Sequence, residues 1–490
     1  MKIVLYGHCG FPYLYREVIL RAKEMHSPIE WKIILLSWRH RALFDGVLPS
    51  ESVFYVSDRI NQLMKEPMPD LTCLRSYPGS LFKDIATDKN FPGMLGRKPK
   101  DYQLKNAVAY YRAYKDYLLK EKPDAVLFPV TESFDGIVLY SVARELVIPT
   151  IFATSSRNFR ITFFSPTPNE ELPAYVFREM ILPEVKTKAA QWVQDNEKNP
   201  ISSLGYTYTP TPEELIPFNK LTPVRKKLWR LPRWLWDLIQ DARREPHVSR
   251  PNPLWFQPIA QFWWLAMLIS RVKGTFRRRF FDLRDTRQLP PRFIYFPLHV
   301  QHELSIMTLA PYFIDQLRAI DLLLYNMPSD HYLVVKEHPV MRGRREVQAY
   351  KALQRKAGLI LADHDIPSHE LIMRASLTVT ITGTAALEAL LLGRPSLILG
   401  KTFFSSWLPM LTSIDHFDET LRSAMATSTE DIHAKAIDCV SHVLQAGYDF
   451  VFFDPHGVGF DSDYTMNRRN IDVFLQSLDD HFRRMANLKR

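Results

Sequence analysis

Three groups of polar residues between positions 292 and 400 each follow an apolar run that is typical of a β-strand. In the first, FPLHVQHE, residues His299, Gln301 and Glu303 come after the run 293–296. Alternation along an extended segment predicts that these three side chains point to one side. A carboxylate beside an imidazole and an amide is a candidate for acid–base chemistry, which makes Glu303 the first-choice catalytic residue. A solvated glutamate is the plainer interpretation.

The second group, VVKEHP, places Lys336 and His338 directly after a predicted strand at residues 332–335. A cation and an imidazole at a strand end suit the phosphate of a nucleotide, and a protonated His338 would make a charge-assisted contact. The alternative is a surface loop with a fortuitous histidine.

The third group follows a predicted buried strand at residues 377–381 and precedes a helix at 385–392 that Gly393 and Pro395 end. A glycine between two hydroxyl residues at a helix start exposes backbone N–H groups to an anion. Glu388, one turn into the helix, is placed to accept hydrogen bonds from ribose hydroxyls. The candidate phosphate-binding residues are Thr382, Gly383 and Thr384, and an ordinary strand–helix turn is the alternative.

The N-terminal part repeats this pattern more weakly. The run 124–130 ends in Thr131, Glu132 and Ser133, and the next predicted strand, residues 148–153, ends in TSSR. Glu132 is the second-choice catalytic residue, as a base or a ligand of the acceptor. The more ordinary interpretation is that Glu132 is simply favoured by the dipole of the helix that follows it.

The three C-terminal motifs resemble the C-terminal half of bacterial capsule and surface-polysaccharide synthesis proteins, over roughly residues 290–400. That family includes transferases of Kdo, an acidic sugar carried on CMP. The His-Pro pair at 338–339 also resembles one in bacterial sialyltransferases, where it meets the donor phosphate. The family often has proline before the glutamate of the first motif, where this chain has His302. The resemblance implies a GT-B fold: an α/β protein with two Rossmann-like domains that face a cleft, the donor being bound by the C-terminal one.

The elements that must position these residues divide the chain into four parts. We predict an N-terminal Rossmann-like acceptor domain at residues 1–165, a helical linker with a basic, aromatic arm at 166–290, a donor domain at 291–465 and a C-terminal helix at 466–490. Residues 40–100 show little periodicity. The aromatic residues of the predicted helix 102–119 have helical spacing, which usually means core packing.

The net charge of +10 lies almost entirely in the basic arm. Residues 221–285 hold 14 Lys and Arg but only 5 Asp and Glu. Six tryptophans accompany them, and the apolar run 262–269 is too short to span a bilayer. The arm therefore fits an anionic membrane surface or an interdomain helical hairpin with outward arginines. Binding to nucleic acid is not expected, because no base-reading fold surrounds the arm.

The sequence indicates no metal site and no cofactor beyond a nucleotide-sugar substrate. Asp461 and Asp463 match the metal-binding DxD pattern only superficially, since they lie in a loop of turn formers near the C-terminus. The three cysteines have no zinc or disulfide spacing, which fits a reducing compartment. The opening MKIVLYGHCG is predicted to be a strand and not a signal peptide.

These observations predict a cytoplasmic, metal-independent glycosyltransferase at the inner membrane face. It would move a nucleotide-activated sugar, with CMP-Kdo or a related CMP-linked acidic sugar as first choice, to a lipid-linked or glycan acceptor. Two alternatives stay open. A nucleotide-sugar epimerase of the same architecture would need no lipid acceptor, and a non-catalytic assembly protein would release no nucleotide.

Overall fold

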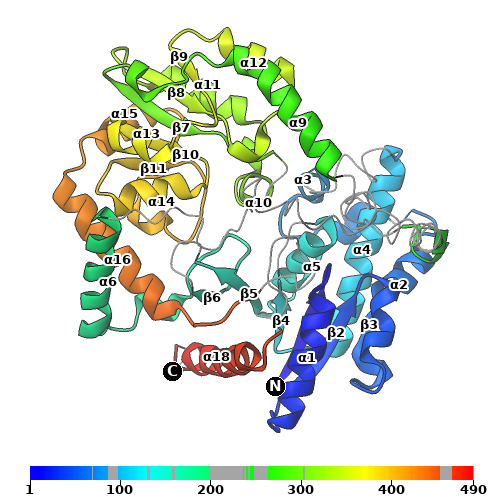
Figure 1. The fold of residues 1–490 in the computed structure, drawn as a ribbon. Helices are drawn as coiled ribbons and strands as arrows, with labels where there is room; N and C mark the ends of the chain where they lie inside the picture. Colours follow the sequence, from blue (N-terminus) through cyan, green and yellow to red (C-terminus); the bar gives the residue numbers. More distant parts are fainter. Residues whose placement is uncertain are drawn as a thin grey trace.

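The computed structural model describes residues 1–68, 70–86, 98–129, 133–156, 161–198, 236, 239–240, 243–247, 263–301, 304–452 and 466–488. These residues form two lobes, each built around its own sheet (Figure 1).

The N-terminal sheet has the strand order β3-β2-β1-β4-β5-β6, and every pair is parallel except β5 with β6. The parallel part is a Rossmann-like order, in which the carboxyl ends of the strands share one edge. Its strands are β1 (Lys2–Gly7), β2 (Glu30–Leu35), β3 (Val53–Tyr55), β4 (Ala125–Phe128), β5 (Thr150–Ser155) and β6 (Thr162–Ser165).

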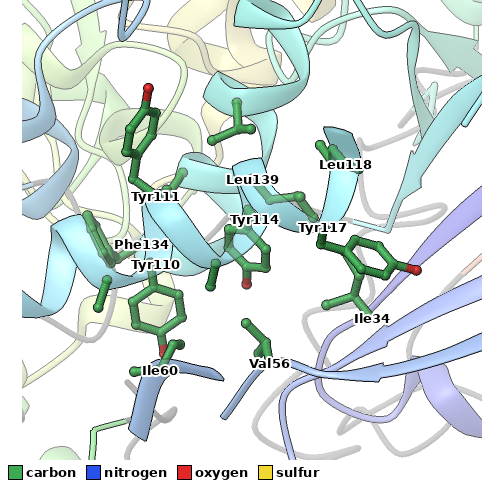
Figure 2. Close-up of a cluster of buried hydrophobic side chains, with 14 of the residues drawn as sticks. Ile34, Val56, Ile60, Tyr110, Tyr111, Tyr114, Tyr117, Leu118, Phe134 and Leu139 are labelled. Atoms are coloured by element: carbon green, nitrogen blue, oxygen red, sulfur yellow. The ribbon is translucent and has the colours of Figure 1, made fainter. Parts of the chain in front are cut away.

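Helices cover this sheet and bury its apolar strands. They are α1 (Phe11–Glu24), α2 (Val56–Leu63), α3 (Leu81–Ala86), α4 (Lys100–Glu121) and α5 (Phe134–Glu145). As the spacing predicted, the aromatic residues of α4 fill the core: Tyr110, Tyr111 and Tyr114 are at most 1% exposed. They lie among Phe134, Ile60 and Val56 in Figure 2.

The C-terminal sheet has the order β11-β10-β7-β8-β9 with all pairs parallel, which is again Rossmann-like. The α/β class with two Rossmann-like domains is thereby confirmed. The strands are β7 (Phe293–Pro297), β8 (Tyr332–Lys336), β9 (Leu359–Ala362), β10 (Leu377–Thr380) and β11 (Ser396–Ile398). The helices are α10 (Leu304–Met307), α11 (Gln316–Asn326), α12 (Val347–Gln354), α13 (Ser368–Arg374), α14 (Thr384–Leu391), α15 (Phe417–Met425) and α16 (Thr429–Ala446).

The chain crosses between the lobes in both directions. Helix α6 (Pro183–Lys198) leaves the N-terminal sheet and packs on α16 of the C-terminal lobe (Figure 1). Helix α18 (Arg468–Asn487) returns to pack on α1. Arg484 of α18 lies 4.0 Å from the ring centre of Tyr175 and also pairs with Glu179. The two lobes are therefore joined by packed helices.

The described parts of the basic arm are anchored to both lobes. Residues 243–247 lie on the N-terminal lobe, where the buried Glu245 accepts hydrogen bonds from Trp38 N–H and the Tyr55 hydroxyl. Helix α9 (Trp263–Arg277) lies on the C-terminal lobe. These parts therefore pack on the lobes with at least one side, while residues 221–235 and 248–262 lie outside the described residues.

Several elements of the N-terminal lobe differ from the sequence-based expectation. The stretch 40–100, expected to be irregular, contains β3, α2 and α3. Strand β3 is too short to show alternation, but Val56, Ile60 and Leu63 of α2 are buried at helical spacing. Strand β6 was also missed, because its four buried residues, TFFS, show no alternation.

No helix among the described residues combines the length and apolar character needed to cross a bilayer. Cys9, Cys73 and Cys439 are all free thiols.

The docking of α9 generates a stability prediction at Gly343, whose φ is +65°. A Cβ there would lie 2.0 Å from the carbonyl oxygen of Ser270 in α9. We expect Gly343→Ala to undock α9, speed the cleavage of the α9 backbone by trypsin at Arg271 and Lys273, and lower the free energy of unfolding.

Gly46 is the matched control, because its φ is +72° but a Cβ there would meet nothing within 4 Å. Gly46→Ala should cost only the backbone strain of a left-handed residue, about 1–2 kcal/mol. Equal losses of stability in the two variants, measured by urea unfolding, would show that α9 does not depend on this contact.

Candidate functional site

The parallel strands of the C-terminal sheet end on one edge, and polar residues follow four of them. His299 follows β7, Lys336 ends β8 and is followed by His338, Asp363 follows β9, and Gly383 follows β10. Ligands of open α/β sheets bind at such an edge. The edge therefore brings together residues from all three motifs that the sequence singled out.

Lys336 is the last residue of β8 and is only 5% exposed. Its Nζ donates to Ser368 Oγ at 2.9 Å, and the same Oγ accepts a hydrogen bond from the Tyr295 hydroxyl at 3.3 Å. Burial lowers the pKa of Lys336 to about 8, against the opposing charge of Glu388 and neighbouring carboxylates. Within the described part of the chain, Ser368 is the sole hydrogen-bond partner of Nζ. An ammonium has three donors, so an incoming anion would find two of them unused.

His338 is half-buried. The sequence predicted a protonated ring at this position, and the structure indicates a neutral one. Its Nδ1 accepts a hydrogen bond from the backbone N–H of Val340 at 3.2 Å, which caps the 3₁₀ turn Pro339–Met341. Burial lowers its pKa to about 4. The ring is therefore neutral at pH 7 and carries its proton on Nε2. It offers a neutral donor rather than a charge.

Between these two residues lies a buried ion pair that fixes the loop. Glu337 is 1% exposed and accepts from Arg345 Nε at 2.7 Å and from the Tyr350 hydroxyl at 2.7 Å. The backbone N–H of His338 donates to the same carboxylate at 2.8 Å. Arg345 also donates to the carbonyl oxygen of His299 at 3.0 Å. The pair thus ties the β7 and β8 loops together.

His299 and Gln301 do not share one face as alternation predicted: His299 is buried and Gln301 is exposed. The His299 Nε2 lies 3.0 Å from Thr380 Oγ1, and its backbone N–H donates to Gln316. His299 is thereby held inside the sheet edge. Gln301 lies 3.5 Å from Arg345 Nη1, and this contact places it beside the ion pair.

The turn after β10 offers fewer groups for contact with an anion than the sequence suggested. Gly383 donates its N–H to Thr380 Oγ1 at 3.0 Å, so this N–H is not available to an anion. A Cβ on Gly383 would lie 2.6 Å from that oxygen and 3.0 Å from the His299 ring, which explains why glycine is required. Thr382 is fully buried, so its predicted contact with phosphate stays a prediction.

Thr384 and Glu388 remain suitable for ligand contact. Thr384 is the first residue of α14, no side chain caps this helix, and Thr384 is partly exposed. Glu388, also partly exposed, is the carboxylate whose charge most favours the ammonium of Lys336. The ribose contact predicted for Glu388 stays a prediction.

A further cluster at this edge was missed from the sequence. Asp363 and Asp365 flank His364, whose Nδ1 lies 2.5 Å from Asp363 and whose Nε2 lies 3.2 Å from Asp365. Arg278 pairs with both carboxylates, at 2.9 Å and 2.5 Å. Burial opposes ionisation of Asp363, but its hydrogen bonds from His364 and Arg278 hold its pKa far below the usual range.

One ligand atom from each of Asp363, His364 and Asp365 lies within 4.8 Å of the others. Arg278 already supplies a cation to both carboxylates, so the geometry describes an ion-pair network better than a metal site. The arginine comes from the end of the basic arm, which sequence spacing could not connect to residue 363.

Several predicted residues lie outside the described part of the chain. These are both candidate carboxylates, Glu303 and Glu132, and the DxD residues Asp461 and Asp463. Their roles remain predictions.

The buried pair generates a stability prediction. Replacing Arg345 with Met leaves Glu337 buried without its counter-charge, which costs about 3–5 kcal/mol. Adding Glu337→Gln should restore part of this loss. The matched control is Arg292→Ala, which breaks the exposed pair with Asp330 and should cost less than about 1 kcal/mol. If urea unfolding gives Arg345→Met and Arg292→Ala the same small cost, the loop does not depend on the pair.

Part of this chain is similar to known proteins. A family model described as capsule polysaccharide biosynthesis protein matches residues 259–450. A curated relative, "Capsule polysaccharide export protein KpsS" of Escherichia coli, is 29% identical over 177 residues. This match covers 34% of the present chain and 44% of the relative, so it spans less than half of that protein.

Two solved structures are weakly similar. "Thermosulfurimonas dismutans KpsC, beta Kdo 2,4 transferase" has 12% identity and a TM-score of 0.34, covering 64% of this chain and 80% of that one. The UDP-GlcNAc 2-epimerase from Neisseria meningitidis has 13% identity and a TM-score of 0.22, covering 98% and 100%. At these TM-scores the fold class rests on the two strand orders alone. The family model covers less than half of this chain, so it shows what residues 259–450 are similar to, in agreement with the resemblance of the strand-end motifs.

Proposed function

We propose that this protein is a glycosyltransferase of capsule polysaccharide biosynthesis that uses a nucleotide-activated sugar, with CMP-Kdo or a related CMP-linked acidic sugar as the donor. The observation that carries the proposal is Lys336, a buried ammonium with unused donors at the ligand-binding edge of a Rossmann-like sheet. The family match over residues 259–450 supports the part of the proposal that concerns capsule polysaccharide. The choice of donor rests on the resemblance of the strand-end motifs to those of Kdo transferases.

In this proposal the donor phosphate lies between Lys336, His338 and the start of α14. Lys336 supplies the charge, His338 donates from Nε2, and Thr384 adds a hydroxyl and a helix N-terminal N–H. Glu388 accepts from the ribose hydroxyls. His299 and Gly383 shape the turn instead of touching the donor, and Gln301 closes the edge beside Arg345.

Catalysis is assigned to carboxylates and not to a metal. Glu303 acts at the reacting carbon or on the attacking hydroxyl, with Glu132 as second choice. Positioned acid–base groups contribute about 10²–10⁴-fold in rate, so a folded Glu303→Gln protein with wild-type turnover would refute the role. Cationic side chains and helix N–H groups neutralise the leaving phosphate. Activity that a chelator abolishes and magnesium restores would point instead to Asp363 and Asp365, or to Asp461 and Asp463.

Donor affinity should depend on pH through Lys336. Its pKa of about 8 means that the cation is present below pH 8 and is lost as the pH rises above it. We therefore expect the affinity for CMP, measured by calorimetry, to be constant near pH 7–7.5 and to fall by up to about tenfold per pH unit above 8.

Lys336→Met should remove a charge-assisted bond worth about 1.5–3 kcal/mol and flatten the pH profile. His338→Ala should cost only about 0.5–1.5 kcal/mol, because the neutral ring makes a neutral hydrogen bond. The exposed Lys351 of α12 is the matched control, and Lys351→Met should bind CMP like the wild type. If the Lys336→Met protein keeps wild-type affinity and pH dependence, the assignment of the phosphate site is wrong.

We also propose that the protein docks peripherally on the inner, anionic face of the cytoplasmic membrane through α9. Ile269, Val272 and Phe276 are 45%, 50% and 71% exposed, and their spacing puts them on one side of the helix. Arg271 and Lys273 of α9 are exposed as well. An apolar stripe with basic neighbours suits a headgroup surface. Arg277 and Arg278 are excluded from this role, because they bind the Arg345 carbonyl and the Asp363 loop.

The corresponding prediction uses liposomes that contain phosphatidylserine. The wild-type protein should sediment with them at low salt and less at high salt, since surface attraction is screened over about 10 Å at 0.1 M salt. Replacing Arg271, Lys273 and Arg279 with Ala should release much of it, at about 1 kcal/mol for each charge. The same triple change at the exposed residues Lys65, Arg75 and Lys120 of the other lobe is the control. Protein that stays in the supernatant at low salt contradicts the docking.

A panel of nucleotide sugars separates this function from its alternatives. A transferase releases nucleotide when the acceptor is present, whereas an epimerase converts the sugar and keeps it attached to the nucleotide. A non-catalytic assembly protein would neither release nucleotide nor convert the sugar. The name of the curated relative, an export protein, fits this alternative.

A further inference from the structure

A cavity of about 280 Å³ lies in the N-terminal lobe at the point where β2 begins. Its wall comes from the end of α1 and the loop after it, from the first residues of β2, and from the segment 48–52 that leads into β3. Every lining residue belongs to the fully described stretch 1–68. Open α/β sheets bind their main ligand at the carboxyl ends of the strands, so this cavity, at the amino ends, is separate from the edge proposed for the chemistry.

Two buried residues of the wall carry polar groups without a partner. Trp31 is 5% exposed, and its indole Nε1 is buried and makes no hydrogen bond. Ser52 is also 5% exposed, and its hydroxyl has no hydrogen-bond partner within the described part of the chain. A buried polar group that stays unpaired costs free energy, and such groups are rare in native proteins. Because both residues line the cavity, a molecule bound in it is the available partner.

The charged residues of the wall balance one another. They are two cations, Lys23 and Lys32, and two carboxylates, Glu30 and Glu51. Lys32 lies 3.5 Å from Glu30 and 3.4 Å from Glu121, and Lys23 donates to a backbone carbonyl oxygen. Glu51 makes no ion pair among the described residues and accepts only a long hydrogen bond, of 3.4 Å, on one of its oxygens. The cavity therefore favours a neutral ligand that donates hydrogen bonds over an anion.

Much of the remaining wall is apolar. It includes Ala22, Ile29, Leu48 and Pro49, and the ring of Trp31 lies in the same wall. A sugar ring matches such a surface, because its C–H groups are apolar and its hydroxyls both donate and accept. The volume is just below the range of about 300–1,000 Å³ that is typical of pockets for drug-sized ligands. The cavity is therefore suited to one sugar ring rather than to a complete nucleotide sugar.

We propose that this cavity is a second, non-catalytic binding site for one neutral sugar ring of a saccharide. The hydroxyls of the sugar accept from Trp31 and Ser52 and donate to Glu51, while its C–H groups lie on the apolar part of the wall. The proposal goes beyond the transferase function and does not rest on it. A site at the amino ends of the strands holds a saccharide on the protein and leaves the carboxyl edges of both sheets to the donor and the acceptor.

The site is tested by saturation-transfer difference NMR on the full chain, with glucose and galactose as probes and glucuronate and galacturonate as their charged counterparts. We expect a neutral sugar to bind with a Kd on the order of 1 mM, since one small ring makes few contacts, and its uronate to bind at least about tenfold more weakly. CMP should not displace the sugar, and its own binding reports on the donor site separately. Failure of both neutral sugars to bind, equal binding of the uronates, or displacement by CMP overturns the proposal.

Variants of the wall locate the bound sugar. Ser52→Leu should fill the cavity and abolish binding, with urea unfolding to show that the protein still folds. Glu51 is exposed, so Glu51→Ala leaves the core intact and should weaken binding by about tenfold through the loss of a charged acceptor. Asp58→Ala is the matched control, because Asp58 is an exposed carboxylate of the same lobe outside the wall, and it should bind like the wild type. Wild-type affinity in Glu51→Ala, or an equal loss in Asp58→Ala, overturns the site.

Discussion

The arrangement of the C-terminal site depends on one buried ion pair, Glu337 with Arg345. The two residues are 1% and 5% exposed, so neither charge is tolerable without the other. Arg345 reaches the β7 loop through the His299 carbonyl, and Glu337 reaches α12 through Tyr350. Because Glu337 lies between Lys336 and His338, the pair fixes the two residues proposed to meet the donor phosphate.

The same burial sets the chemistry of these neighbours. It lowers the pKa of Lys336 to about 8 and that of His338 to about 4. One residue therefore remains a cation at pH 7 and the other becomes a neutral donor, although their positions in the sequence look equivalent. The site combines the fixed charge of Lys336 with the directional hydrogen bond of His338. Such a pair suits a phosphate ester, which carries negative charge and has oxygens in fixed directions.

The basic arm is connected to this site. Arg277 donates to the Arg345 carbonyl at 2.6 Å, and Arg278 holds the Asp363 loop whose charge acts on Lys336. Helix α9 packs against Gly343 in the same loop. Under the proposed function, the helix that meets the membrane on one face would thus contact the donor loops on the other, by packing and ion pairs rather than by proximity in sequence.

The sequence predicted the strand ends well and the long-range partners poorly. The runs before Lys336 and Gly383 are apolar, buried and short, so β8, β10 and α14 were predicted to within a residue or two. Arg345 and Arg278 were missed because nothing in the sequence tells which arginine pairs with a buried carboxylate. The burial of Thr382 could not be predicted, because a hydroxyl residue before a helix start looks the same in the sequence whether it is exposed or buried.

The central claim, that the edge of the C-terminal sheet binds the phosphate of a nucleotide through Lys336, is tested most directly by a crystal structure with CMP bound at pH 7. The account predicts phosphate density within hydrogen-bond distance of Lys336 Nζ and close to His338 Nε2 and Thr384. CMP bound with its phosphate elsewhere, while Lys336 still contacts only Ser368, would contradict it.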